Sequence, residues 1–184
     1  MSRPHVFLRI AVVVLISWIS GSGSQIGLLY LGLPVLAAVL IAQKGGDRYL
    51  TEDGERVTRW LSFIVGFLAY LALLSDKLPE FKAPTVRLDI TCSGSPNVGS
   101  ALLRILKAIP SALALMIIGI VGWIVWIVAA VSILITERYP ESLWNFQRGM
   151  VRWEARLLGY VASLTEVYPP FSFDTGPAES VSHQ

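Results

Sequence analysis

One uncharged apolar stretch, Ser111 to Thr136, limits what this chain can fold into. A helix of that length measures about 39 Å at 1.5 Å per residue, which exceeds the roughly 30 Å hydrocarbon core of a bilayer. The rest of the composition agrees, because 54% of the 184 residues are hydrophobic and only 15% are charged, against about 25% charged in a typical soluble domain. We therefore expect an integral membrane protein in which this span tilts or protrudes.

Three further apolar segments raise the expected number of membrane helices to about four. They cover residues 6–20, 25–42 and 57–75, and the second contains Pro34. The expected fold class is an all-α integral membrane protein with about four transmembrane helices, a C-terminal interfacial amphipathic helix and one short extended β-like segment.

The first of these segments has two interpretations. Arg3, the apolar run 10–19 and the small residues after it also fit a cleavable signal peptide. We favour a retained helix, because another apolar run follows directly after the Gly/Ser turn at 21–24. Cleavage would leave the topology of the other spans unchanged.

The distribution of Lys and Arg predicts the orientation. If both termini are cytoplasmic, 10 basic residues lie in the N-terminus, the 44–59 loop and the tail, and 5 lie in the outer segment 76–109. We therefore expect both termini, and the 44–59 loop, on the cytoplasmic side.

Residues 85–92 alternate apolar and polar side chains, which is typical of a strand. Val86, Leu88 and Ile90 share the apolar side. No second convincing strand exists to satisfy the backbone of this one. It either lies over the protein surface as an extended arm or pairs with another chain. We predict pairing, with these three residues contacting a protein partner or an identical copy.

Two amphipathic segments flank the long span. Residues 99–109 resemble an elbow helix that Pro110 separates from the span. In residues 141–166, apolar side chains recur every three or four positions beside a row of arginines four apart, which is typical of a helix lying in the headgroup plane. We predict that the row, Arg148, Arg152 and Arg156, contacts anionic lipid headgroups. Alternatively, these arginines pair with Glu residues or face water. The expected interfacial anchors are Trp60, Trp144, Trp153 and Tyr160.

The C-terminal half also resembles a known family. The motifs are Arg138-Tyr139-Pro140, Phe146-Gln147-Arg148-Gly149, Arg152-Trp153, Arg156, Tyr160, Leu164 and Tyr168-Pro169-Pro170-Phe171-Ser172, with Val86-Arg87-Leu88-Asp89 and Ala108-Ile109-Pro110 upstream. Over about residues 85–174 they are similar to the bacterial membrane family catalogued as domain of unknown function 4389. The resemblance implies a membrane domain and a location in the bacterial cytoplasmic (inner) membrane, and it supplies no activity.

These segments suggest three parts. Residues 1–76 form an N-terminal membrane region, residues 77–174 a family-like domain, and residues 175–184 a flexible tail.

Chemistry-bearing patterns are scarce. His5 and His183 lie at opposite termini, and Cys92 is the sole cysteine, so we expect no catalytic residues, no metal site and no cofactor. With a net charge of only +2, we expect no nucleic-acid partner. Trp123 and Trp126 lie at mid-span on one helical face, where they are expected to contact a neighbouring helix or a partner. A cofactor or pigment contact is the less favoured alternative.

The leading hypothesis is a non-enzymatic integral membrane protein: an accessory, scaffold or assembly component that contacts anionic lipid and a protein partner or a second copy. The alternative is a lipid-binding or lipid-processing protein that uses the arginine row for headgroup phosphates. A small channel or transporter is the weakest hypothesis, because the cores of the last three spans contain no ionisable residue.

Overall fold

The computed structural model describes residues 24–81, 86, 88, 90 and 92–173, and within them it is helical without strands. The elements are α2 (Ser24–Lys44), α3 (Gly46–Arg48), the π-helical turn η1 (Tyr49–Asp53), α4 (Gly54–Leu71), α5 (Val98–Thr136) and α6 (Glu141–Val161). The expected all-α class is confirmed. The expected span at 6–20 and the tail at 175–184 lie outside the described residues.

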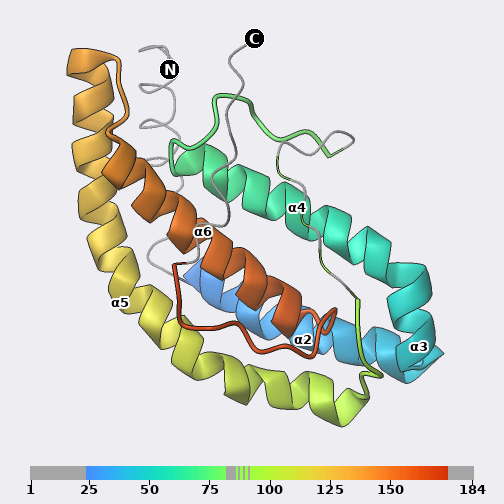
Figure 1. The fold of residues 1–184 in the computed structure, drawn as a ribbon. Helices are drawn as coiled ribbons and strands as arrows, with labels where there is room; N and C mark the ends of the chain where they lie inside the picture. The colour runs from blue at the N-terminus through green and yellow to red at the C-terminus, as the bar shows by residue number, and fades with distance from the viewer. Residues whose placement is uncertain (1–23, 82–85, 87, 89, 91, 174–184) are drawn as a thin grey trace.

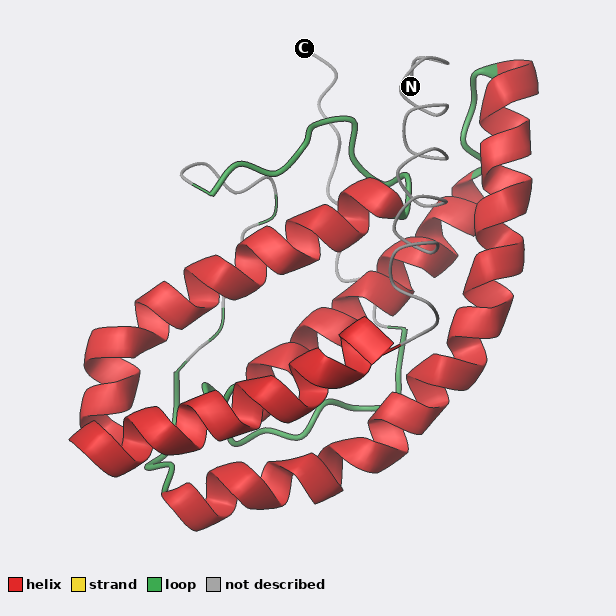
Figure 2. Ribbon diagram, turned by 180° about the vertical axis from the view of Figure 1, so that it is seen from behind, coloured by secondary structure: helices red, strands yellow, loops and turns green. Residues whose placement is uncertain are grey.

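The helices form two hairpins that pack against each other, with α6 at the centre of the bundle. The first hairpin is α2 and α4, joined through α3 and η1, and the second is α5 and α6 (Figure 1). α6 packs against α5, α4 and α2. The long α5 curves around the outside of the other helices, which is equally clear from behind (Figure 2).

The turn between α2 and α4 depends on two glycines. Gly45 has a φ of 86°, a conformation that favours glycine. A Cβ on Gly46 would collide with the carbonyl group of Pro96, so this close approach also requires glycine. The chain bends by 117° between α2 and the segment Gly46–Leu71.

α5 is a single helix from Val98 to Thr136, which corrects the expected division into an elbow and a separate span. It begins with a capping box, in which the Ser100 amide donates to Asn97 Oδ1 at 2.7 Å and the Asn97 amide donates to Ser100 Oγ at 3.0 Å. Pro110 removes one backbone donor, and the helix continues through it.

α6 lies inside the bundle, which differs from the interfacial position expected for it. The second half of its apolar stripe is buried, for example at Leu157, whereas Phe146 and Met150 in the first half are half-buried. Small residues on its other faces, such as Gly149 and Ala155, are also buried. These small residues let neighbouring segments come close on more than one side. The predicted stripe exists, but it faces protein.

The segment around residues 86–92 forms no strand among its described residues, Val86, Leu88, Ile90 and Cys92. Regular strand structure requires a second strand to accept and donate backbone hydrogen bonds. The first three side chains are half-buried and pack against the largest hydrophobic core. The alternation therefore identifies the side that faces the protein. Backbone pairing with another chain stays a prediction.

α5 is long and apolar enough to cross a membrane, and only 17% of its most apolar window is buried inside the protein. If the bent pair made of Leu29–Lys44 and Gly46–Leu71 counts as one span, the described residues contain two. Four transmembrane helices are thus not confirmed.

The structure also corrects the expected topology. Gly46, in the loop expected inside, lies against Pro96, in the segment expected outside. Because the two touch at one end of the bundle, they cannot lie on opposite sides of a bilayer.

Candidate functional site

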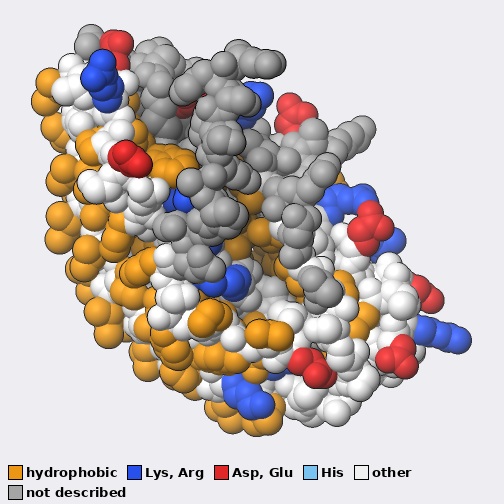
Figure 3. Space-filling view, in the orientation of Figure 1, with side chains coloured by type: hydrophobic (Ala, Val, Ile, Leu, Met, Phe, Trp, Pro, Cys, Tyr) orange, Lys and Arg blue, Asp and Glu red, His pale blue; other side chains and the backbone are white. Residues whose placement is uncertain are grey.

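The most prominent surface is the outer face of α5. Its large apolar side chains are about half exposed or more from one end of the helix to the other, with Leu106 63%, Ile120 65% and Ile135 71% exposed. In the space-filling view the hydrophobic atoms gather along this curved edge, whereas charged groups gather elsewhere (Figure 3). A soluble monomer rarely exposes an apolar patch of this extent. This face fits hydrocarbon or another apolar surface.

The three arginines of the expected lipid-binding row lie on α6 and are half-buried. The guanidinium carbon of Arg148 lies 4.6 Å from the centre of the Trp144 ring. Arg156 donates from Nη2 to the backbone oxygen of Ser172 at 2.9 Å. Arg148 and Arg152 have further interactions. The row is thus held at least partly by the protein itself, and headgroup contact stays a prediction.

The four aromatic residues expected as interfacial anchors have different surroundings. Trp60 on α4 is 53% exposed and contacts Phe81, with 4.6 Å between ring centres. Trp144 is half-buried beneath Arg148. Trp153 and Tyr160 are buried in the bundle, because α6 is enclosed by other helices. Of these four, Trp60 has the exposure that a surface anchor requires.

Trp123 and Trp126 pack edge to face, with ring centres 5.8 Å apart. Trp123 is exposed on the outer face of α5. Trp126 donates from its indole nitrogen to the backbone oxygen of Leu71 at 2.8 Å. Its neighbour is thus the end of α4 in the same chain. The predicted contact of Trp123 with a partner stays a prediction.

The structure gives Arg104 a role that the sequence pattern of the amphipathic segment 99–109 did not indicate. Arg104 is 5% exposed and donates to the backbone oxygens of Tyr160 and Thr165. Its guanidinium carbon also lies 4.8 Å from the centre of the Tyr160 ring. It therefore ties α5 to the carbonyl groups at the end of α6, where a cation is favourable.

Two other polar groups lie within the bundle. Ser111 Oγ and the Tyr168 hydroxyl are 2.6 Å apart. Glu154, on α6, is half-buried. Neither arrangement provides a nucleophile with an adjacent base. In the part of the chain that the structure describes, no group of three or more His, Cys, Asp or Glu could hold a metal.

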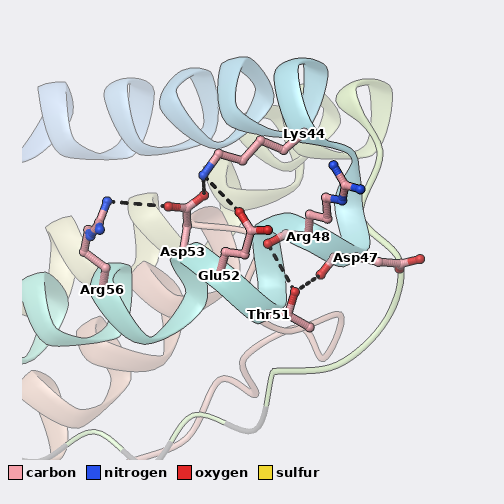
Figure 4. A network of polar contacts seen from close by, with 7 residues as sticks. All are labelled: Lys44, Asp47, Arg48, Thr51, Glu52, Asp53 and Arg56. Atoms are coloured by element: carbon pink, nitrogen blue, oxygen red, sulfur yellow. Dashed lines mark hydrogen bonds and ion pairs between the residues drawn. The ribbon is translucent and has the colours of Figure 1, made fainter.

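A charged network braces the turn between α2 and α4 (Figure 4). Lys44 Nζ lies 2.8 Å from Asp53 Oδ2 and 3.4 Å from Glu52 Oε2. Arg56 Nη1 lies 3.7 Å from the other oxygen of Asp53, whose carboxylate is buried. All four residues of the network lie within 13 positions of one another in the sequence, so the pairing is local. The network fixes the turn and offers no reaction centre.

In a comparison with known proteins, one part of the chain matches a family. Residues 99–172 match the model of a family described as Domain of unknown function (DUF4389), which confirms the resemblance on that segment. No curated protein and no solved structure matches the chain. The upstream motif around Val86 lies outside the matched residues.

Proposed function

We propose that the segment matching the Domain of unknown function (DUF4389) family is the membrane-embedded part of a non-enzymatic accessory or scaffold protein. The observation that carries the proposal is the apolar outer face of α5. Each fully buried side chain of Leu, Ile or Val size gains about 1.5–3 kcal/mol on leaving water. More than ten such residues on α5 remain largely exposed in the isolated chain, so a bilayer would stabilise this face strongly.

In this proposal α5 crosses the bilayer between Lys107 and Glu137. Every exposed side chain from Ile109 to Ile135 is apolar, and this length spans about 39 Å at 1.5 Å per residue. The curvature and length allow a tilted crossing. The protein is expected in the bacterial inner membrane, with the α5–α6 turn and the C-terminus on the cytoplasmic side.

The internal contacts of the arginine row favour a scaffold over lipid processing. A headgroup site needs guanidinium donors directed at solvent-level phosphates, whereas Arg148 stacks on Trp144 and Arg156 binds Ser172. Anionic lipid contact at the remaining exposed atoms stays part of the proposal. The exposed Trp123 is the residue proposed to contact a protein partner or a second copy.

Cysteine labelling from the outside of intact cells tests the embedding. In a Cys92→Ser background, Ser95→Cys and Ser142→Cys place near-isosteric thiols at exposed positions beside the two ends of α5. We expect Ser95→Cys to react and Ser142→Cys to be protected until the membrane is permeabilised. Glu52→Cys should behave like Ser95→Cys, because the α2–α4 turn and Pro96 lie at the same end. Equal reaction at both ends of α5 would contradict a crossing helix.

Native purification separates the two functional classes. We expect a stoichiometric protein partner or a second copy to remain bound in mild detergent. A tightly retained phospholipid without any protein partner would instead support lipid handling.

A further inference from the structure

We infer that residues 24–81 are a second, diverged copy of the helical-hairpin unit that the family model matches at 99–172. We further infer that each unit provides the surface on which the other unit of the same chain docks. The two units are equivalent at a constant offset of 90 residues. This inference does not depend on the proposed membrane function, since it rests on contacts within the chain.

The offset aligns the ends of α4 and α6 residue by residue. The identical pairs at and around these helix ends are Arg48 and Arg138, Tyr49 and Tyr139, Leu68 and Leu158, Tyr70 and Tyr160, Ala72 and Ala162, Leu74 and Leu164, Pro79 and Pro169, and Phe81 and Phe171. Between them, Ser75 corresponds to Thr165 and Asp76 to Glu166, which preserves the hydroxyl and the charge. A spacing kept without insertion over this length indicates one structural unit used twice.

The two helices end with the same backbone geometry. At the end of α4, the amide of Leu73 donates to Tyr70 O at 3.2 Å, and that of Leu74 donates to Ala69 O at 2.9 Å. At the end of α6, the amides of Ser163 and Leu164 donate to the corresponding carbonyl groups at 3.0 and 3.2 Å.

Two further details of the caps repeat. Leu73 and Ser163 both adopt the left-handed conformation, with φ of 63° and 60°. Four residues after each of these positions, the amide of Lys77 donates to the hydroxyl of Ser75 and the amide of Val167 donates to the hydroxyl of Thr165, both at 3.2 Å. Left-handed caps without glycine are uncommon, so their repetition at matched positions is specific.

The chain then folds back over its own helix in both units. Phe81 packs edge-on to Phe63, with ring centres 6.0 Å apart, and Phe171 packs edge-on to Trp153 at 5.6 Å. Position 153 is the counterpart of position 63 at the same offset. The preceding prolines, Pro79 and Pro169, are both buried.

Each unit closes on the other through an equivalent tyrosine. Tyr49, before α4, donates its hydroxyl to Ala162 O at the end of α6, at 2.5 Å. Tyr139, before α6, donates to Ala72 O at the end of α4, at 3.5 Å. These two reciprocal hydrogen bonds require α4 and α6 to be antiparallel, and they relate the units by an approximate two-fold axis. Figure 1 shows the result, with the two hairpin turns at opposite ends of the molecule.

Hydrogen exchange on the full-length protein tests the reciprocal contacts. Tyr49→Phe should speed exchange of the Ser163 and Leu164 amides, in the other unit, by about threefold to tenfold, as loss of one hydrogen bond implies. Tyr139→Phe should do the same for Leu73 and Leu74. Each variant serves as the control for the other. If each variant loosened the cap of its own unit instead, the docking scheme would be overturned.

A register-dependent graft tests the equivalence itself. Residues 75–81 are replaced in the full chain by residues 165–171 in one variant and, as the matched control, by residues 164–170 in another. The in-register graft keeps proline at the buried position 79 and should melt within about 4 °C of the parent, whereas the shifted graft places tyrosine there and should melt lower by at least twice that amount. Equal melting temperatures for the two grafts would show that the offset has no structural meaning.

Discussion

Leu73 and Ser163 occupy equivalent left-handed positions, but they differ in how well the site suits them. This conformation costs an L-residue about 1–2 kcal/mol. The Leu73 side chain is fully buried and packs with Ala130 and Ile133. The Ser163 side chain is equally buried, and its hydroxyl has no hydrogen-bond partner among the residues described. Ser163 therefore combines a strained backbone with an unsatisfied polar atom.

Ser163→Gly should raise the free energy of unfolding by about 1–2 kcal/mol, since glycine adopts positive φ freely and removes the buried hydroxyl. Thermal unfolding in detergent measures the change. Ser163→Ala is the control, because it removes the hydroxyl and keeps the backbone cost, so its gain should be smaller. A lower melting temperature for Ser163→Gly than for the parent would mean that the serine makes a contact of its own.

Single residues also show where sequence analysis reaches its limit. Arg104 and Lys107 look alike in the sequence, as two basic residues of one amphipathic segment. Lys107 is exposed, whereas Arg104 is buried against carbonyl groups 56 and 61 positions later in the chain. Nothing local distinguishes the two, because the acceptors come from the distant end of α6.

At the scale of whole elements, the helices predicted at 25–42, 57–75 and 141–166 exist with shifted ends, whereas the elbow and the long span predicted separately are one helix. The apolar segment 25–42 corresponds to Ser24–Lys44, and the amphipathic segment 141–166 to Glu141–Val161. Apolar periodicity identified these helices but not their neighbours. The glycines of α6 mark the places where neighbouring segments come close to this helix. A Cβ on Gly149 would come within 2.9 Å of Phe173, and one on Gly159 within 3.0 Å of Ile90.

Gly122 lies where α5 and α6 come close together, so a larger side chain there tests how tightly the two helices pack. Gly122 is buried, a Cβ there would lie 3.0 Å from Met150 Sδ, and its backbone oxygen accepts a hydrogen bond from Gln147 Nε2 at 2.8 Å. Gly122→Leu should therefore force the helices apart and lower the free energy of unfolding by about 1–3 kcal/mol.

Gly119 provides the matched control on the same helix, because a Cβ there meets nothing within 4 Å. Gly119→Leu should leave the protein unchanged or stabilise it by up to about 1 kcal/mol, since it removes a glycine from a helix interior. Gly122→Leu should therefore melt below the parent, and Gly119→Leu should melt at or above it. Similar losses for both variants would place a neighbour on the outer side of α5 as well.

For the whole molecule, the sequence predicted a membrane protein but not the correct topology of its segments. Counting basic residues assigned the 44–59 loop and the 76–109 segment to opposite sides, yet Gly46 touches Pro96. Charge counting treats each apolar segment as an independent span, whereas here α2, α4 and α6 share one core. The 90-residue offset was readable in the sequence, because identical residues recur at it. It becomes convincing only when both helix ends have the same geometry.

If the outer face of α5 lies against lipid, this helix anchors the whole molecule in the membrane. A charge placed on that face tests whether it does. Ile120 and Leu106 are almost equally exposed, at 65% and 63%. Ile120 lies well inside the proposed crossing, whereas Leu106 lies beside Lys107 at its edge, where a lysine can reach the headgroups. A lysine at the centre of a membrane helix costs about 2.5–3.5 kcal/mol. Ile120→Lys should therefore reduce the fraction that stays in alkali-washed membranes, while Leu106→Lys should match the parent. Full retention of both variants would place the outer face of α5 against water or protein.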